Sequence, residues 1–423
     1  MSRRSELDAI IVGAGGIGAA LALALARDGF EVALVEAREP KPWRGEDEVD
    51  LRVVALAPDA RALLGHLDVW PSIHASRSSA YRRMRVWDAL APGELGFDAA
   101  DSGEAALGWI VENTLIQHVL WQAFRGGSFP ATPDRETTSA SPPPPSLHLD
   151  LRESSASSAR LYCPAEVVDI ENGAGAVTAT LGDGTRLRAK LLVAAEGADS
   201  SLRGKLGIAF GGRDYGQRAV VAHVGTERSH EATAWQRFQP GGPLAFLPLA
   251  DGRSSIVWSL PDAEATRVLA LDDEAFRAEL GCAFDFRLGA ITQATSRAAF
   301  PLRMRLAERY VVGRCVLAGD AAHVVHPLAG QGMNLGFRDV TCLLRVLHDA
   351  RERRADLGAV HVLRRYERER RSENTIAARG LDAIQHVFDS NNGALAMARG
   401  VALAASDRIS LLKHVFAAAA AGH

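Results

Sequence analysis

A run of glycines between two short apolar segments near the start of this chain constrains its fold more than any other feature. Residues 9–12 form a continuous apolar run, typical of a parallel strand that is covered on both faces. Residues 16–28 are rich in Ala and Leu and contain no Pro, which predicts a helix that ends at Gly29. A second apolar run follows at residues 32–35. The order of strand, glycine turn, helix and strand predicts a βαβ unit.

The glycines at this turn, in residues 13–18, have the spacing G-x-G-x-x-G. Gly13 allows the tight turn, Gly15 lets the backbone approach a pyrophosphate, and Gly18 lets the helix pack closely on the strand. The pyrophosphate would lie at the helix N-terminus, where free N–H groups and the dipole favour anions. Glu36 ends the second strand, where a carboxylate accepts hydrogen bonds from an adenosine ribose and repels a 2′-phosphate. This part of the sequence predicts FAD or NAD and argues against NADP.

A second glycine-rich segment, far along the chain, favours FAD over NAD. A strand-like run at residues 316–318 enters a turn at Asp320, where the carboxylate is placed to accept hydrogen bonds from ribityl hydroxyls. Gly330 and Gly332 would present backbone N–H groups at a helix N-terminus to the flavin pyrimidine, where negative charge gathers on reduction. Because the two glycine segments address different parts of one FAD, we expect non-covalently bound FAD.

Residues 319–323 and 326–339 resemble the second FAD motif of the class A flavoprotein aromatic hydroxylases, the relatives of para-hydroxybenzoate hydroxylase. Residues 196–203 resemble the third signature of this family, with Glu196 in place of the usual Asp. Four further segments are similar to the ubiquinone-biosynthesis hydroxylases within the family: residues 50–56, 107–113, 235–238 and 242–249. The resemblance extends over nearly the whole chain except residues 126–159, whose Pro- and Ser-rich composition predicts a flexible insertion.

This resemblance implies a mixed α/β fold, in which a Rossmann-like FAD-binding domain is interleaved with an antiparallel-sheet substrate domain and followed by a C-terminal helical region. The expected ranges are 1–75, 100–205 and 296–365 for the FAD-binding domain, 76–99 and 206–295 for the substrate domain, and 366–423 for the C-terminal helices.

The resemblance also implies that FAD performs the chemistry. NAD(P)H would reduce the flavin, and O₂ would then form a flavin hydroperoxide that hydroxylates an aromatic ring. We therefore assign no catalytic side chain, place Arg52 and Pro327 near the flavin ring, and expect Gln117 at the ribose–phosphate portion of FAD. The other expected cofactor contacts are Gly13, Gly15, Gly18, Glu36, Asp320, Gly330, Gly332, Met333 and Asn334.

Three of these assignments have simpler alternatives. Arg52 could form a surface salt bridge with Asp50, and Gln117 could be a solvated residue on a helix. His323 and His326 are spaced three apart and could share a helix face. No third metal ligand is evident near them, so we expect them to pack within the glycine motif and predict no metal site.

Charge and cysteine usage limit the partners of the chain. Its 48 basic and 51 acidic residues give a net charge of −3, so no basic field predicts a nucleic acid partner. Four widely spaced cysteines predict a reducing, cytoplasmic location. No uncharged stretch reaches the roughly 18 apolar residues that span a membrane. Peripheral contact at the inner face of a membrane, or a place in a biosynthetic complex, remains compatible with the sequence.

The sequence also indicates the character of two segments near the C-terminus. Residues 364–371 interleave Arg with Glu, which predicts a solvated helix face. Residues 395–416 mix apolar side chains with Arg and Lys, which fits either a packed helix or an interfacial amphipathic one.

Three functions are compatible with the sequence. The first is a flavin monooxygenase that acts on a prenylated phenol or quinol in ubiquinone biosynthesis. The second is a hydroxylase of the same fold with a soluble aromatic substrate. The third is a non-catalytic FAD-bound scaffold of a biosynthetic complex.

Overall fold

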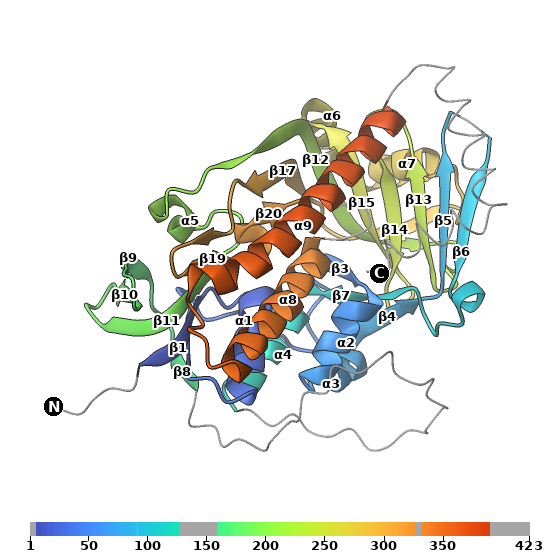
Figure 1. Cartoon of the computed structure of the whole chain (residues 1–423). Coiled ribbons are helices and arrows are strands. Elements are labelled where there is room, and N and C mark those ends of the chain that lie inside the picture. Colours follow the sequence, from blue (N-terminus) through green and yellow to red (C-terminus); the bar gives the residue numbers. More distant parts are fainter. Residues whose placement is uncertain (1–5, 91, 127–158, 326–331, 390–423) are drawn as a thin grey trace.

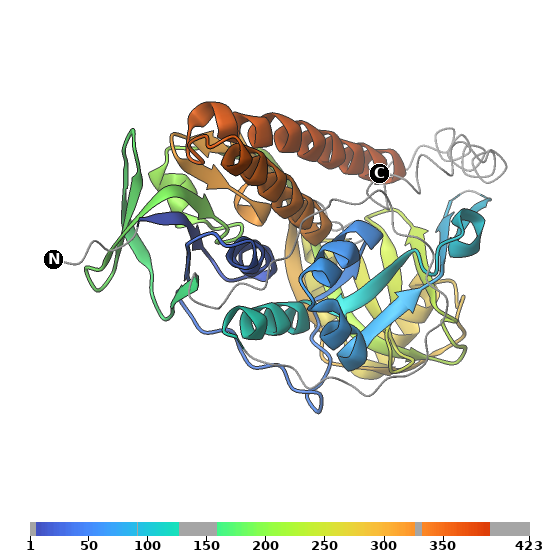
Figure 2. The same ribbon diagram turned by 60° about the horizontal axis from the view of Figure 1, so that its bottom comes forward.

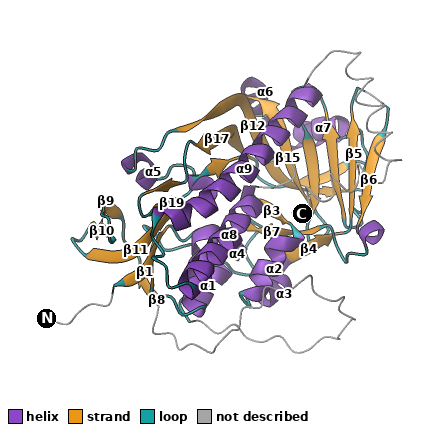
Figure 3. Cartoon of the chain, in the orientation of Figure 1, coloured by secondary structure: helices purple, strands orange, loops and turns teal. Residues whose placement is uncertain are grey.

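The computed structural model describes residues 6–90, 92–126, 159–325 and 332–389 (Figure 1). The predicted insertion, apart from its end residues, lies outside this part of the chain, as do Pro327, Gly330 and residues 390–423. The described elements form a helix-covered sheet with a parallel centre on one side of the molecule and a mainly antiparallel sheet on the other (Figure 3). The fold class predicted from the sequence is confirmed.

The first sheet contains the predicted βαβ unit. Its strands are β1 (Leu7–Val12), β2 (Val32–Val35), β8 (Ala159–Tyr162), β9 (Val167–Asn172), β10 (Val177–Leu181), β11 (Arg186–Ala194), β18 (Val311–Val312) and β19 (Cys315–Leu317). The main order is β18-β19-β11-β1-β2-β8, with β10 also beside β11 and β9 beside β10. Strand β1 pairs in parallel with β2 and β11, and β11 pairs in parallel with β19. The carboxyl ends of these four strands therefore meet at one edge of the sheet.

The helix of the βαβ unit, α1 (Gly16–Arg27), is buried over most of its surface. It packs against β1, β2, α4 (Asn113–Phe124) and α8 (Gly332–Glu352), and α8 packs in turn against α9 (Val360–Asp389). A helix that is apolar all round is stable only when neighbours cover it, and its alanines allow them to approach closely. Its position brings the glycine turn close to the start of α8, although more than 300 residues separate the two in the sequence.

The second sheet is antiparallel except where β13 pairs with β5. Its strands are β5 (Arg83–Asp88), β6 (Glu94–Asp98), β12 (Phe210–Thr226), β13 (Thr233–Phe238), β14 (Leu244–Pro248), β15 (Ser254–Pro261), β16 (Ile291–Ala294), β17 (Ala298–Ala307) and β20 (His323–Val324). They follow the order β20-β17-β12-β15-β14-β13-β5-β6, with β16 beside β12. Two helices, α6 (Asp262–Leu269) and α7 (Asp273–Ala283), pack on it.

Smaller elements connect the two sheets. The strands β3 (Val53–Leu56), β4 (Ser78–Tyr81) and β7 (Gly108–Glu112) form a third sheet in the order β3-β7-β4. The remaining helices are α2 (Pro58–His66), α3 (Trp70–Arg77), α5 (Ser201–Lys205) and the 3-10 turns η1 (Ala99–Ser102) and η2 (Gly319–Ala321).

The second sheet extends further along the chain than the expected domain boundary at residue 295. Strand β17 pairs with β12 from Phe210 opposite Ala307 to Val221 opposite Ala298, and β20 pairs with β17. The physical reason is the length of β12. This long strand pairs with β17, although β17 follows the predicted end of the substrate domain in the sequence. The division of the chain into domains stays a prediction.

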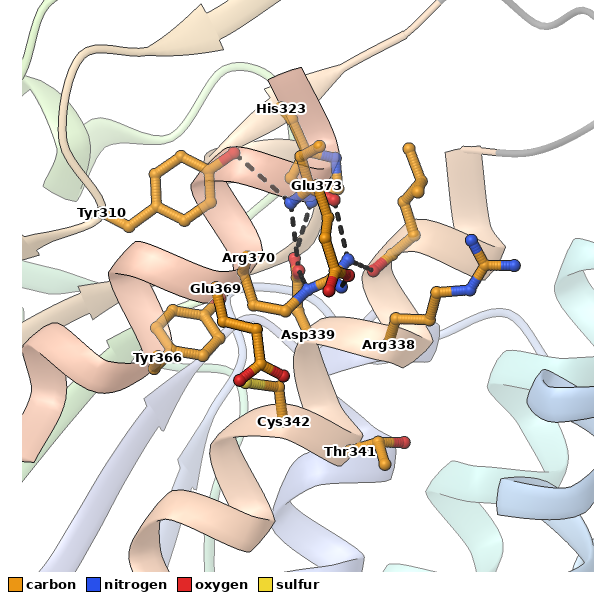
Figure 4. A network of polar contacts seen from close by, with 12 residues as sticks. Tyr310, His323, Arg338, Asp339, Thr341, Cys342, Tyr366, Glu369, Arg370 and Glu373 are labelled. Atoms are coloured by element: carbon orange, nitrogen blue, oxygen red, sulfur yellow. Dashed lines mark hydrogen bonds and ion pairs between the residues drawn. The ribbon is translucent and has the colours of Figure 1, made fainter. Parts of the chain in front are cut away.

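A buried polar network joins the first sheet to α8 and α9 (Figure 4). The Asp339 carboxylate on α8 accepts hydrogen bonds from Gly319 N at 2.9 Å and from His323 Nε2 at 2.6 Å. It also accepts from Arg370 Nε at 2.8 Å and Asn374 Nδ2 at 3.2 Å, both on α9. Burial by itself raises the pKa of Asp339, but His323 and Arg370 outweigh burial and hold that pKa below its usual value.

This network predicts that Asp339 is a major source of stability. Asp339→Ala removes the buried ion partner of Arg370, leaves it only the half-exposed Glu373, and should lower the free energy of unfolding by about 3–5 kcal/mol. Asp349→Ala is the matched control, because Asp349 also pairs with an arginine of α9, Arg365, but both side chains are about one-third exposed. Its cost should be about 0–1 kcal/mol.

Urea unfolding of the three proteins measures the difference. Because the pKa of Asp339 is lowered in the folded protein, the effect should be complete above the ordinary aspartate pKa. It should fade as the pH falls through the lowered value. Equal stability of the two variants at neutral pH would contradict the assignment.

Candidate active site

A cavity of about 690 Å³ lies at the carboxyl ends of the parallel strands. Residues that follow β1, β2, β11 and β19 line one side of it: Gly13, Glu36, Glu196 and Asp320 are examples. The opposite wall comes from the second sheet and consists of Ala219, Val221, Val257, Phe300, Pro301, Leu302 and Arg303. In open α/β sheets, ligands bind at this edge. The cavity therefore joins the predicted nucleotide end to a largely apolar wall.

The three motif glycines have different neighbours in the structure. Gly13 has a φ of +101°, and a Cβ there would lie 2.5 Å from the carbonyl oxygen of Ala195. A Cβ at Gly18 would overlap the carbonyl oxygen of Gly13. Gly15 instead lines the cavity, and a Cβ there would meet no atom of the described residues within 4 Å. Gly13 and Gly18 are thus required by the fold, whereas Gly15 leaves the backbone open to a ligand.

The peptide groups of Ala14 within this loop are held from two sides. Glu36 Oε2 accepts a hydrogen bond from Ala14 N at 2.5 Å, and Gln117 Nε2 on α4 donates to Ala14 O at 2.9 Å. Glu36 also lines the cavity, while its Oε1 accepts from Arg38 N at 3.1 Å. Gln117 thus supports the glycine loop, and its predicted contact with FAD stays a prediction. This support was not foreseen, because Gln117 lies 103 residues from Ala14.

Asp320 lies where the sequence placed it, in the turn that follows β19. Its side chain is exposed to the cavity although it lies deep in the protein. These surroundings raise the pKa of Asp320 by desolvation, and the charges of His323 and Arg52 act in the opposite direction. The preceding residue, Gly319, is held by Asp339 through its backbone N–H. The buried network therefore positions a carboxylate that faces the cavity.

The N-terminus of α8 forms another part of the cavity wall. Gly332 and Met333 line the cavity, and N–H groups in a first helical turn have no carbonyl partner within the helix. The Asn334 side chain is buried, with Nδ2 donating to Ala55 O at 2.8 Å and Oδ1 accepting from Ala57 N at 3.0 Å. The side chain of Asn334 therefore connects α8 to the end of β3. Its own contact with the cofactor stays a prediction.

Arg52 lines the cavity from the segment that precedes β3. Among the described residues its guanidinium forms no ion pair within 4 Å, and the Asp50 carboxylate accepts instead from Arg52 N at 3.0 Å. The alternative of a salt bridge to Asp50 is therefore not what this structure contains. The expected role of Arg52 at the flavin stays a prediction.

Two buried residues anchor the segment that carries Arg52. Glu112, at the end of β7, accepts from Asp50 N at 2.7 Å and from Trp43 Nε1 at 3.2 Å. His223 on β12 donates from Nε2 to Asp50 O at 3.1 Å. Burial lowers the pKa of His223, which favours its neutral form. Glu112 therefore holds this segment from the third sheet, and His223 holds it from the second.

Sequence reasoning gave neither Glu112 nor His223 a role. Glu112 did carry a detectable signal, because an acid that directly follows the apolar run at residues 109–111 needs a partner when it is buried. The signal at His223 was weaker, since it is one polar residue within a strand-like run. His323 is buried and donates to Asp339, whereas His326 lies outside the described residues. The described residues contain no group of three potential metal ligands, and the absence of a metal site stays a prediction.

This arrangement defines a protein of the dinucleotide-binding α/β type whose site is suited to a flavin nucleotide. Gly15, Glu36, Asp320 and the start of α8 all face one cavity. The chain belongs to the FAD binding domain family, which it matches over residues 6–379. The family assignment confirms FAD as the cofactor.

The chain is also similar to several characterised enzymes. It is 35% identical to 3-demethoxyubiquinol 3-hydroxylase of Escherichia coli, with 95% of each chain covered. It is 34% identical to ubiquinone hydroxylase UbiL of Rhodospirillum rubrum, with 97% of this chain and 88% of the relative covered. It is also 34% identical to the human ubiquinone biosynthesis monooxygenase COQ6, with 96% and 90% covered. The resemblance to the ubiquinone-biosynthesis hydroxylases is confirmed.

Solved structures share the fold at lower identity. PqsL of Pseudomonas aeruginosa, in complex with 2-aminobenzoylacetate, has a TM-score of 0.72 and 21% identity, with 93% of this chain and 98% of that chain covered. HpxO of Klebsiella pneumoniae, in complex with FAD and uric acid, has a TM-score of 0.68 and 20% identity, with 97% of both chains covered.

The position of Glu36 yields a test of the nucleotide end. Glu36→Ala removes an acceptor that lines the cavity and frees Ala14 N, so FAD binding should weaken by about 1–3 kcal/mol. Glu39→Ala is the control, because Glu39 lies three residues away, is exposed and pairs only at the surface with Arg125. Titration of the apoproteins with FAD measures both constants. Equal affinities in the two variants would show that Glu36 does not contribute.

The position of Gly332 yields a test of the flavin end. Among the described residues, a Cβ there would come no closer than 4.0 Å to any atom, and Val325 Cγ2 is that neighbour. Gly332→Val should therefore change the flavin reduction potential while lowering the free energy of unfolding by less than about 1 kcal/mol. Gly336→Val, one turn later, meets Ile17 at 2.7 Å and should destabilise the fold by about 1–3 kcal/mol. A potential that is unchanged in Gly332→Val would place the flavin elsewhere.

Proposed function

We propose that this protein is an FAD-dependent monooxygenase that hydroxylates the aromatic ring of a prenylated phenol or quinol in ubiquinone biosynthesis. The observation that carries the proposal is the single cavity that joins the glycine loop at Gly15 to the apolar wall of the second sheet. The names of three relatives that are 34–35% identical over almost the whole chain support the same reaction class.

The residues of the first sheet bind and orient the cofactor in this proposal. When bound, FAD supplies the reducing electrons, taken from NAD(P)H, and the activation of O₂. Glu36 accepts hydrogen bonds from the ribose, the backbone at Gly15 approaches the pyrophosphate, and Asp320 accepts from the ribityl hydroxyls. The free N–H groups at the start of α8 favour negative charge at the pyrimidine edge.

The second sheet determines which substrate the cavity accepts. Val221, Val257, Phe300 and Leu302 form an apolar surface, which favours an aromatic ring with a hydrocarbon tail over a charged compound. Such a wall also excludes water from the reacting ring. Arg52 lies on the same cavity and is placed to contact the flavin or to control its movement.

The proposal also covers the co-substrate and the location of the protein. The sequence contains no second dinucleotide fingerprint, so NAD(P)H binds transiently from solution. No described helix has the length and apolar character needed to cross a membrane. We place the protein in the cytoplasm, with peripheral contact at the inner face of the membrane that holds a prenylated substrate.

The decisive experiment follows the origin of the added oxygen. The purified holoenzyme should oxidise NAD(P)H faster when a prenylated phenol is present. Under ¹⁸O₂, mass spectrometry of the product should find one labelled oxygen atom on the ring. Oxygen from water, or no hydroxylated product with any prenylated phenol, would refute the proposal.

Two further outcomes distinguish the alternatives. Turnover of soluble phenols alone would identify a hydroxylase of the same fold with another substrate. An FAD-loaded protein that oxidises no NAD(P)H with any phenol would identify a scaffold.

A further inference from the structure

The outer face of α9 carries arginines that the rest of the described chain does not neutralise. In the sequence, residues 364–371 interleave Arg and Glu, and the charges balance in part. The structure separates the arginines from the glutamates. Glu367 accepts from Tyr310 N at 2.7 Å, Glu369 binds Arg345 on α8 at 2.6 Å, and Glu373 pairs with the buried Arg370. The acids of this stretch are therefore already used within the protein.

Four arginines of α9 point the other way. They are exposed, and none forms an ion pair within the described residues: Arg364, Arg368, Arg371 and Arg379. Two other arginines of the helix are paired, Arg365 with Asp349 and Arg370 with Asp339. The helix thus has one side that is paired with α8 and one side with unpaired positive charge.

The spacing of the four arginines places them on one face of the helix. Separations of four, three and eight residues correspond to nearly whole turns, and the stripe is about 22 Å long. We call this stripe the arginine face. Ile376 borders it and is 69% exposed. Figure 2 shows α9 along the outer edge of the molecule, where no described element covers its outer side.

We propose that the arginine face binds the anionic headgroups of a lipid membrane. Guanidinium groups bind phosphate through paired hydrogen bonds, and each basic residue near an anionic bilayer contributes about 1 kcal/mol. The exposed Ile376 provides an apolar side chain that enters the interface beside the headgroups. An exposed apolar side chain next to unpaired arginines favours a lipid surface over a nucleic acid or an acidic protein.

The arginine face lies close to the wall of the cavity. Ala378 of α9 packs with Val325 and Leu335, and Met304 of β17 packs against this cluster. The same strand contributes Phe300 to the cavity wall. Tyr215 of β12 also donates to Asp382 of α9 at 2.9 Å. If the proposed function holds, membrane binding through α9 keeps the substrate wall near the bilayer that dissolves a prenylated substrate.

The test uses the full-length, FAD-loaded protein and sedimentation with vesicles. The wild type should bind vesicles of phosphatidylcholine mixed with phosphatidylglycerol, should not bind phosphatidylcholine alone, and should dissociate as salt is added. A variant with Arg364→Gln, Arg368→Gln, Arg371→Gln and Arg379→Gln should lose binding, by about fivefold for each arginine removed.

A control variant loses the same charge elsewhere. It carries substitutions to Gln at four exposed arginines outside α9: Arg125, Arg186, Arg188 and Arg218. This control should bind anionic vesicles much more strongly than the α9 variant. Equal loss in both variants would show that net charge alone decides binding, and failure of the wild type to bind would overturn the proposal outright.

A second measurement separates this proposal from the proposed function. Hydroxylation of a short-tailed phenol without vesicles should be the same in the wild type and the α9 variant, because the arginine face is outside the cavity. Loss of vesicle binding with this activity retained supports the proposal. Vesicle binding by a wild type that hydroxylates no phenol would refute the function and leave the arginine face supported.

Discussion

The carboxylate of Asp339 accepts hydrogen bonds from four groups, and the geometry of the site depends on them. Gly319 N comes from the turn that carries Asp320, His323 from β20, and Arg370 and Asn374 from α9. A buried charge is costly unless it is paired and fully hydrogen-bonded, so these partners must come together when the protein folds. The hydrogen bonds that stabilise the packing of α8 and α9 therefore belong to the same network that holds the turn with Asp320.

The cavity shows how two sheets with different tasks share one site. The parallel sheet ends in backbone and carboxylate groups that suit a nucleotide, and the antiparallel sheet supplies an apolar wall. The segment with Arg52 also lines this cavity and is held by Glu112 of the third sheet and by His223 of the antiparallel sheet. A shift of the antiparallel sheet relative to the third sheet would therefore move Arg52 within the cavity.

The charged residues of α9 are divided between two sides of the helix. Its inward side binds Asp339 and α8 through Arg370 and Arg365, while its acids bind neighbours within the protein. Four exposed arginines of α9 have no ion partner among the described residues, although the whole chain has a net charge of −3. The interleaved sequence of residues 364–371 predicted a solvated face. Arg364, Arg368 and Arg371 are exposed in the folded helix, which also separates paired from unpaired charge.

The sequence by itself determined the βαβ unit and the tasks of its glycines, because these depend on neighbours a few residues apart. The limits on φ at Gly13 and on space at Gly18 follow from one local turn, and Glu36 follows from the length of β2. Only the tertiary structure decided what Gln117 and Asn334 do. Their partners lie 103 and 277 residues away, and a side-chain amide gives no sign in the sequence of which distant backbone group it will meet. The same holds for Glu112 and His223, since a buried polar group predicts that a partner exists but not where the chain will bring it.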